Sequence, residues 1–70
     1  MIPLNLADMG EPQIVKKIGG TPEVKKHLTD LGFTVGGEVS LVSMLGGNVI
    51  VKVKESRVAI SDELARKIMV

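Results

Sequence analysis

The single histidine of this chain is the residue best placed for metal chemistry. His27 lies four residues after Glu23 and three before Asp30, and residues at these spacings share one flank of a helix. One imidazole with two carboxylates is a ligand set suited to ferrous iron or manganese. The alternative is a solvated helix edge, because the chain has no second histidine and no cysteine. We expect no cofactor, and Glu23, His27 and Asp30 are the candidates if a metal such as Fe²⁺ binds.

Catalytic residues are scarce in the sequence. There is no cysteine to act as a nucleophile, and no serine stands close to His27 in the sequence. Paired carboxylates need a dry pocket to become an acid and a base, and a domain of 70 residues has little room for one. The sequence therefore predicts a protein that is not an enzyme.

A glycine pair before a threonine resembles a turn that binds anions. Gly19 and Gly20 lead into Thr21, where free backbone N–H groups at a helix start could point at a phosphate. The Lys-Ser/Thr ending of a P-loop and the Gly-x-Gly-x-x-Gly pattern of dinucleotide folds are both missing. We therefore predict a plain strand-to-helix connection with Thr21 as its cap.

Four lysines could form a basic strip that binds RNA; they are Lys16, Lys17, Lys52 and Lys54. Single-stranded RNA is held largely by stacking on aromatic side chains, and Phe33 is the only aromatic residue. The formal net charge is only +1, so general binding to polyanions is not expected either. We favour lysines that protect exposed strands from aggregation, and predict no nucleic-acid partner.

The elements that position these residues must be short. With 70 residues and no cysteine, we expect one domain over residues 1–70, stabilised by aliphatic packing without disulfides. Neither a signal peptide nor a run of about 20 apolar residues is present, which predicts a cytoplasmic protein with no direct membrane insertion.

One helix is well signalled at about 21–31. Thr21 is its expected N-cap, Pro22 its first residue, and Gly32 its stop. Val24, Leu28 and Leu31 follow a spacing of four and three residues, which gives a single apolar stripe. The helix is therefore expected to be half buried.

Four or five short strands surround this helix, with turns at Gly46-Gly47 and Glu55-Ser56. The expected strands are 11–18, 39–44, 48–54, 57–60 and, as a closing strand, 68–70. Ser61 is expected to cap a short C-terminal helical turn at about 61–67. We predict a mostly β fold, a small SH3-like antiparallel barrel with one inserted α-helix.

Apolar side chains exceed what so small a core can bury. The surplus beyond the patterned core is Ile2, Leu4, Leu6, Met9, Val35, Met44, Leu45 and Met69. These residues either cover the barrel ends or form exposed patches that contact another protein, including a second copy of this chain as a homo-oligomer. The composition thus favours a protein-protein interaction module.

The order of the sequence blocks resembles the FeoA family, small cytosolic accessory proteins of the ferrous iron transporter FeoB. Residues 26–39, KHLTDLGFTVGGEV, are similar to the family core, residues 46–53 to its hairpin, and residues 61–70 to its ending. The matching positions that the resemblance implies to be structural are Leu28, Leu31, Gly32, Gly36, Ala65 and Ile68. The chain departs from the family pattern at His27, Val35, Glu55 and Ile60.

The resemblance implies a non-enzymatic module that docks on the cytosolic region of a FeoB-like membrane transporter, peripheral to the inner membrane, and modulates ferrous iron uptake. One alternative is a carrier that binds ferrous iron directly. Another is a regulatory module, because the same SH3-like domain resembles the C-terminal domain of DtxR-type metal-dependent repressors. No helix-turn-helix precedes it here, so DNA binding is not implied.

Overall fold

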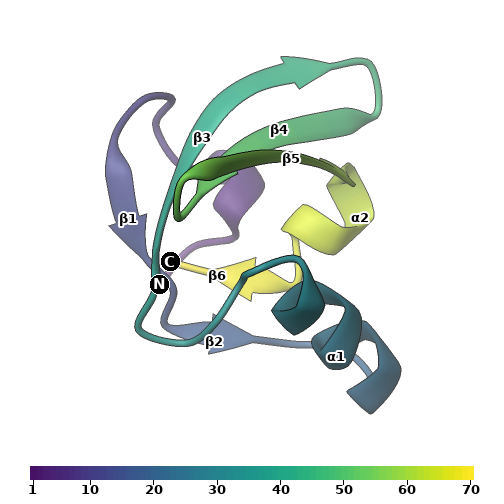
Figure 1. The fold of residues 1–70 in the computed structure, drawn as a ribbon. Coiled ribbons are helices and arrows are strands. Elements are labelled where there is room, and N and C mark those ends of the chain that lie inside the picture. Colours follow the sequence, from purple (N-terminus) through teal and green to yellow (C-terminus); the bar gives the residue numbers. More distant parts are fainter.

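Six strands form two antiparallel sheets. The computed structural model describes residues 1–70 (Figure 1). The larger sheet has the order β1-β3-β4-β5, and its strands are Pro12–Ile14, Glu38–Leu45, Asn48–Val53 and Ser56–Ser61. The smaller sheet pairs β2 (Lys17–Ile18) with β6 (Ile68–Met69). The mostly β, SH3-like fold is confirmed, although the two sheets are not joined into one closed ring.

The first predicted strand is wrong as a single element. β1 ends at Ile14, which pairs with Glu38, whereas β2 starts at Lys17 and pairs with Met69. Between them the N–H of Val15 donates to the carbonyl of Gly37 at 2.9 Å. The chain therefore leaves one sheet for the other at Val15, whose side chain is buried while that of Ile14 is exposed. The strand predicted over 11–18 is therefore two short strands that belong to different sheets.

The predicted hairpin is confirmed. β3 and β4 are joined by the two residues Gly46 and Gly47, and Gly46 has a φ of 58°. Such a two-residue turn matches the twist of antiparallel strands. A register shift between Leu41 and Ser43 marks a β-bulge. Because of it, Ser43 lies opposite Ile50.

The inner face of the hairpin carries three valines of β4. Val49, Val51 and Val53 are all buried, as their period of two predicts. In β5, Val58 lies opposite Val51 and Ile60 opposite Val49. The turn before β5 differs from the prediction by one residue, because Val53 pairs with Ser56 and the turn residues are therefore 54 and 55.

Helix α1 spans Pro22–Asp30, close to the predicted range. The Thr21 hydroxyl accepts a hydrogen bond from the N–H of Val24 at 3.3 Å, which confirms the N-cap. At the other end, the N–H of Phe33 donates to the carbonyl of Leu28, and that of Gly32, with φ at 110°, to the carbonyl of Thr29. These two bonds form a Schellman motif, which turns the fully buried Phe33 under the helix.

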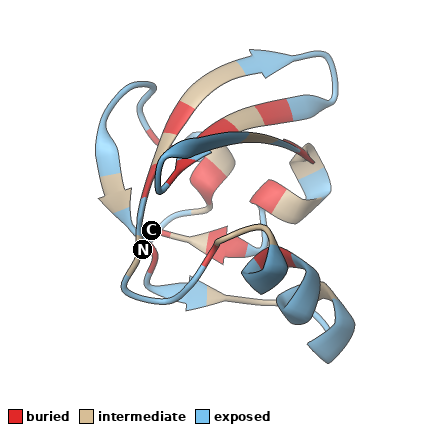
Figure 2. Ribbon diagram, in the orientation of Figure 1, coloured by how far each residue is buried: buried red, intermediate tan, exposed pale blue.

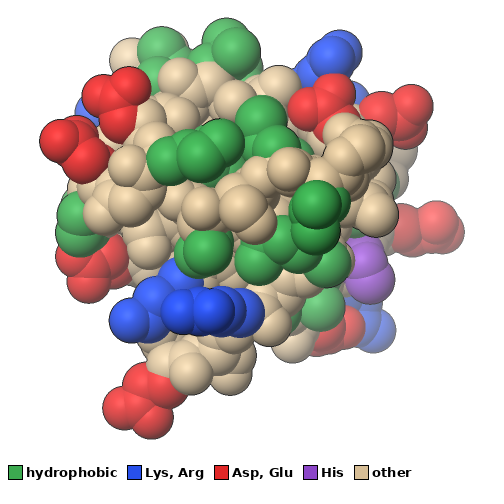
Figure 3. Space-filling model, turned by 90° about the horizontal axis from the view of Figure 1, so that it is seen from above, with side chains coloured by type: hydrophobic (Ala, Val, Ile, Leu, Met, Phe, Trp, Pro, Cys, Tyr) green, Lys and Arg blue, Asp and Glu red, His purple; other side chains and the backbone are tan.

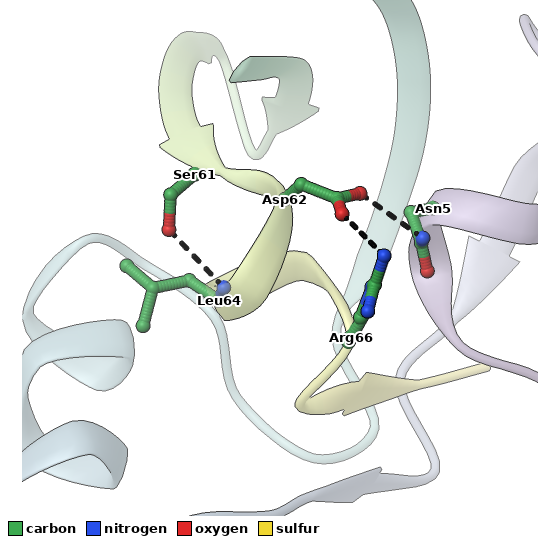
Figure 4. Close-up of polar contacts among 5 residues, drawn as sticks. All are labelled: Asn5, Ser61, Asp62, Leu64 and Arg66. Atoms are coloured by element: carbon green, nitrogen blue, oxygen red, sulfur yellow. Dashed lines mark hydrogen bonds and ion pairs between the residues drawn. The ribbon is translucent and has the colours of Figure 1, made fainter. Parts of the chain in front are cut away.

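Helix α2 is shorter than the predicted turn at 61–67 and spans Asp62–Ala65. Ser61 caps it as predicted, because its Oγ accepts the N–H of Leu64 at 3.2 Å (Figure 4). α2 also contacts the short 3-10 helix η1 (Leu4–Leu6), which the sequence did not predict. This contact brings the two ends of the chain together. Ile2 and Val70 also exchange two backbone hydrogen bonds.

The buried residues lie between the sheets and helices (Figure 2), and all of them are apolar. This core contains no buried polar or charged residue, and its members are Leu4, Ala7, Val15, Leu28, Phe33, Val39, Leu41, Val49, Val51, Val53, Ile60, Ala65, Ile68 and Val70. Three of the family-motif positions, Leu28, Ala65 and Ile68, have no exposed surface. Aliphatic packing around one phenylalanine therefore stabilises the domain, as the composition predicts.

Candidate functional site

The three candidate metal ligands lie on helix α1. Glu23, His27 and Asp30 are all exposed on this helix. No group of three or more histidine, aspartate or glutamate side chains lies close enough together to hold a metal ion. The helical spacing predicted the shared flank, yet the structure does not gather these side chains into a ligand set.

The glycine pair before α1 is used for packing. The N–H of Gly19 donates to the carbonyl of Lys67 at 2.7 Å, which ties the segment to the residue before β6. Gly20 has a φ of 98°, and a Cβ there would meet Val24 at 3.0 Å. The glycine pair thus allows Val24 to pack closely and leads into the helix cap, as predicted for a strand-to-helix connection.

The four lysines of the predicted basic strip are divided between the sheets. Lys17 belongs to β2 and Lys16 hydrogen-bonds through its N–H to Met69 of β6, so both follow the smaller sheet. Lys52 is in β4 of the larger sheet, and Lys54 follows directly after that strand. The sequence left open whether Lys16, Lys17, Lys52 and Lys54 form one basic strip, and the structure divides them between the two sheets.

A second basic side chain joins Lys52 on the outer face of the larger sheet. Arg57 of β5 lies directly opposite Lys52 of β4, on the face away from the buried valines, and both side chains are exposed. Two residues closer to the Gly46-Gly47 turn, Ile50 lies opposite Ala59 on this same face. The sequence analysis missed this pair because it placed the turn at Glu55-Ser56, whereas the observed two-residue turn at 54–55 places residue 57 opposite residue 52.

The outer face of the larger sheet carries Ile50, Lys52, Arg57 and Ala59, so it combines positive charge with apolar side chains. Figure 3 shows a group of Lys and Arg side chains beside apolar side chains on the side seen from above. The single ion pair of the structure joins Arg66 to Asp62 and lies elsewhere, so Lys52, Lys54 and Arg57 have no carboxylate partner. Their charge is available to a ligand or a partner.

A small hollow also opens on the outer face. Its volume is about 150 Å³, and its lining comprises Pro12, Glu38, Val39, Ser40, Lys52 and Lys54. Sites for metabolites usually enclose about 300–1,000 Å³ and bury most of the ligand. The hollow is too small and too polar for such a ligand.

The predicted surplus of apolar side chains is largely exposed. Leu4 is the exception that lies fully in the core, and Met69 is half buried. The large apolar residues with the most exposure are Met1, Ile2, Leu6, Met9, Ile14, Val35, Met44 and Leu45. Leu45 and Met44 stand at the end of β3 beside the hairpin turn. Six of the eight surplus residues are therefore exposed, and Met1 and Ile14 are exposed in addition to them.

Neither helix has the length and hydropathy needed to cross a membrane. What the fold and surface define is a small SH3-like β domain whose charged side chains are all outside the core. A family model described as the FeoA domain matches residues 2–70. The chain therefore belongs to the FeoA domain family, and the family resemblance is confirmed.

One curated relative is 39% identical over all 70 residues and is matched over 85% of its length. It is a protein of Methanocaldococcus jannaschii described as a candidate Fe(2+) transport protein A. Among solved structures, an iron uptake regulatory protein (FeoA) is 28% identical, with a TM-score of 0.86 over 96% of this chain and 89% of that chain.

Two more distant structures share the fold. Iron(II) transport protein A of Clostridium thermocellum is 21% identical, with a TM-score of 0.89 over 97% of this chain and 43% of that chain. A manganese-dependent transcriptional repressor is 16% identical, with a TM-score of 0.84 over 94% of this chain and 38% of that chain. At these identities the likeness concerns the fold alone.

Proposed function

We propose that this protein is a non-enzymatic accessory of ferrous iron transport, which acts by binding the cytosolic region of a FeoB-like transporter. The observation that carries the proposal is the family match over residues 2–70, together with a relative named for Fe(2+) transport that is 39% identical over the whole chain. Binding at the cytosolic side would place the protein at the inner membrane through its partner.

The structure supports binding more than catalysis. Every buried side chain is apolar, so no titratable group lies in a dry environment where acid-base chemistry would be favoured. The outer-face hollow is about 150 Å³, which is small for a substrate. Exposed apolar side chains such as Leu6 and Leu45, each about two-thirds exposed, are instead suited to contact with another protein.

The departures from the family pattern bear on how this chain would dock. Ile60 is buried in the core, so it cannot replace a basic side chain at a docking surface. Val35 and His27 are exposed, on the loop after α1 and on α1 itself. Glu55 is exposed in the turn between β4 and β5. A partner matched to this chain should therefore carry compensating changes.

Co-purification tests the proposal. The tagged protein should retain the FeoB-like transporter of its own organism in detergent extract, and deletion of its gene should lower uptake of radioactive ferrous iron. Expression of the wild-type chain should restore uptake, whereas a Leu28→Asp variant, with a carboxylate in the core, should not. Unchanged uptake in the deletion strain and no retained transporter would contradict the proposal.

A further inference from the structure

Strand β5 forms an open edge of the larger sheet. It is the last strand in the order β1-β3-β4-β5 and pairs only with β4 over Ser56–Ser61. No backbone hydrogen bond links these six residues to any other segment. In an antiparallel pair alternate residues bond to the neighbouring strand, so the other half of β5 directs its N–H and C=O groups to the free side.

Little in the sequence of β5 protects this edge. Natural edge strands are usually short, or carry lysine, proline or a bulge. β5 lies next to β4 at the edge of the larger sheet (Figure 1). Its six residues are in regular register with β4, and Arg57 is its only charged residue. Arg57 and Ala59 are exposed on the outer face, while Ile60 points into the core. The edge is long, regular and sparsely charged, which suits the addition of another strand.

The side chains beside the edge specify what the added strand should carry. Arg57 lies opposite Lys52, and both lack a carboxylate partner. The next outward pair is apolar, Ala59 opposite Ile50. A strand laid antiparallel against β5 would place one residue beside Ala59 and, two residues later, one beside Arg57.

From this juxtaposition we infer that β5 binds an extended segment of a partner protein by strand addition. The segment carries an apolar residue and, two positions later, an acidic residue, and both of these side chains lie on the outer face. The carboxylate lies beside Arg57 and Lys52, and the apolar side chain lies beside Ala59 and Ile50. Strand addition does not depend on the transport role; only the assignment of the segment to a FeoB-like transporter rests on the proposed function.

A second copy of this chain fits the edge poorly. The sequence of β5, SRVAIS, contains no acidic residue, so a paired copy would add its own Arg57 and Lys52 to a surface that is already basic. An anionic membrane would satisfy the charge, but it has no backbone to pair with the free N–H and C=O groups of β5. An acidic extended segment satisfies both requirements.

A peptide titration tests the inference. The ¹⁵N-labelled protein is titrated with a capped peptide, Thr-Val-Thr-Val-Thr-Glu-Thr, while amide shifts and hydrogen exchange are followed. We expect shifts centred on Ser56–Ser61 and slower exchange of alternate amides of β5. Arg57→Glu should weaken binding about tenfold, as for loss of a charge-assisted hydrogen bond, and a peptide with Lys in place of Glu should restore it. Lys25→Glu, the same charge change on exposed α1, should leave binding unchanged.

Three results would overturn the inference. One is equal binding of a peptide that is N-methylated on the side facing β5, since this change removes strand pairing without altering the protein. Another is dimerisation through β5 without peptide, seen as concentration-dependent shifts. The third is binding to phosphatidylglycerol vesicles with no binding of the peptide. The transporter is absent from these measurements. A negative result would therefore overturn strand addition without contradicting the proposed function, which co-purification and iron uptake test.

Discussion

Asp62 joins the two ends of the chain through Asn5, which is 57 residues away in the sequence. Its Oδ1 accepts a hydrogen bond from Nδ2 of Asn5 at 3.1 Å, and its Oδ2 pairs with Arg66 at 2.8 Å (Figure 4). Asp62 is also in the first turn of α2, where a negative charge is favoured. One carboxylate thus fastens η1 to α2 and stabilises the short helix.

Asp62→Ala should lower the free energy of unfolding by about 1–2 kcal/mol, since it removes a hydrogen bond to a charged group and a favourable helix charge. Asn5→Ala should cost less, because Oδ1 of Asn5 is buried without a partner and its removal offsets the lost bond. Urea unfolding followed by circular dichroism measures both. Glu63→Ala, an exposed acid in the same turn, is the matched control for helix charge. Equal losses for Asp62→Ala and Glu63→Ala would show that the contact with Asn5 is unimportant.

Gly32→Ala should destabilise the domain by about 1–3 kcal/mol, the usual cost of a backbone conformation that L residues rarely adopt. Gly32 has a φ of 110°, and a Cβ there would stand 3.4 Å from Val53. The Schellman motif below α1 would be strained as a result. Gly47→Ala is the control, since its φ is not positive and nothing lies within 4 Å of the added atom. Thermal unfolding of the two variants distinguishes them, and similar midpoints would contradict the expectation.

Lys54→Gly should stabilise the domain by about 0.5–1 kcal/mol. Lys54 is the one non-glycine residue with a positive φ, 55°, and glycine relieves about 1–2 kcal/mol of left-handed strain while adding some entropy to the unfolded chain. Lys52→Gly, the same substitution inside β4, should have the opposite sign, because glycine weakens a strand interior. Chemical denaturation curves measure both effects. A destabilised Lys54→Gly variant would mean that its side chain makes a contact worth more than the strain.

Local rules predicted most of the fold. The period of two in 48–54, the glycine pair and the caps at Thr21 and Ser61 all depend on neighbours in sequence, and the structure confirms them. The change of sheet at Val15 was missed in the strand predicted over 11–18, because its cause is a choice between two distant partners, Gly37 and β6. Leu4 was missed as a core residue for the same reason, since η1 packs against α2 at the far end of the chain.

The candidate site was less predictable than the fold. Helical spacing correctly placed Glu23, His27 and Asp30 on α1, but spacing fixes only the side of a helix and not whether side chains converge. Arg57 is a candidate binding residue because it lies opposite Lys52 in the pairing of β4 with β5. This pairing can be predicted only if the turn is placed correctly at 54–55. A one-residue error in that turn would exchange the two faces of β5.

Anaerobic titration with Fe²⁺ should produce no saturable, site-specific change at His27. The three α1 side chains are exposed and do not form a ligand group, and an isolated surface imidazole competes poorly with water for ferrous iron. Paramagnetic broadening of ¹⁵N resonances should therefore rise in proportion to metal and be the same in the wild-type protein and in His27→Ala. Saturable broadening confined to α1, abolished by His27→Ala and by Glu23→Gln, would instead establish a metal site and revive the carrier hypothesis. Zinc, which binds imidazole more strongly, serves as the positive control for accessibility of the His27 ring.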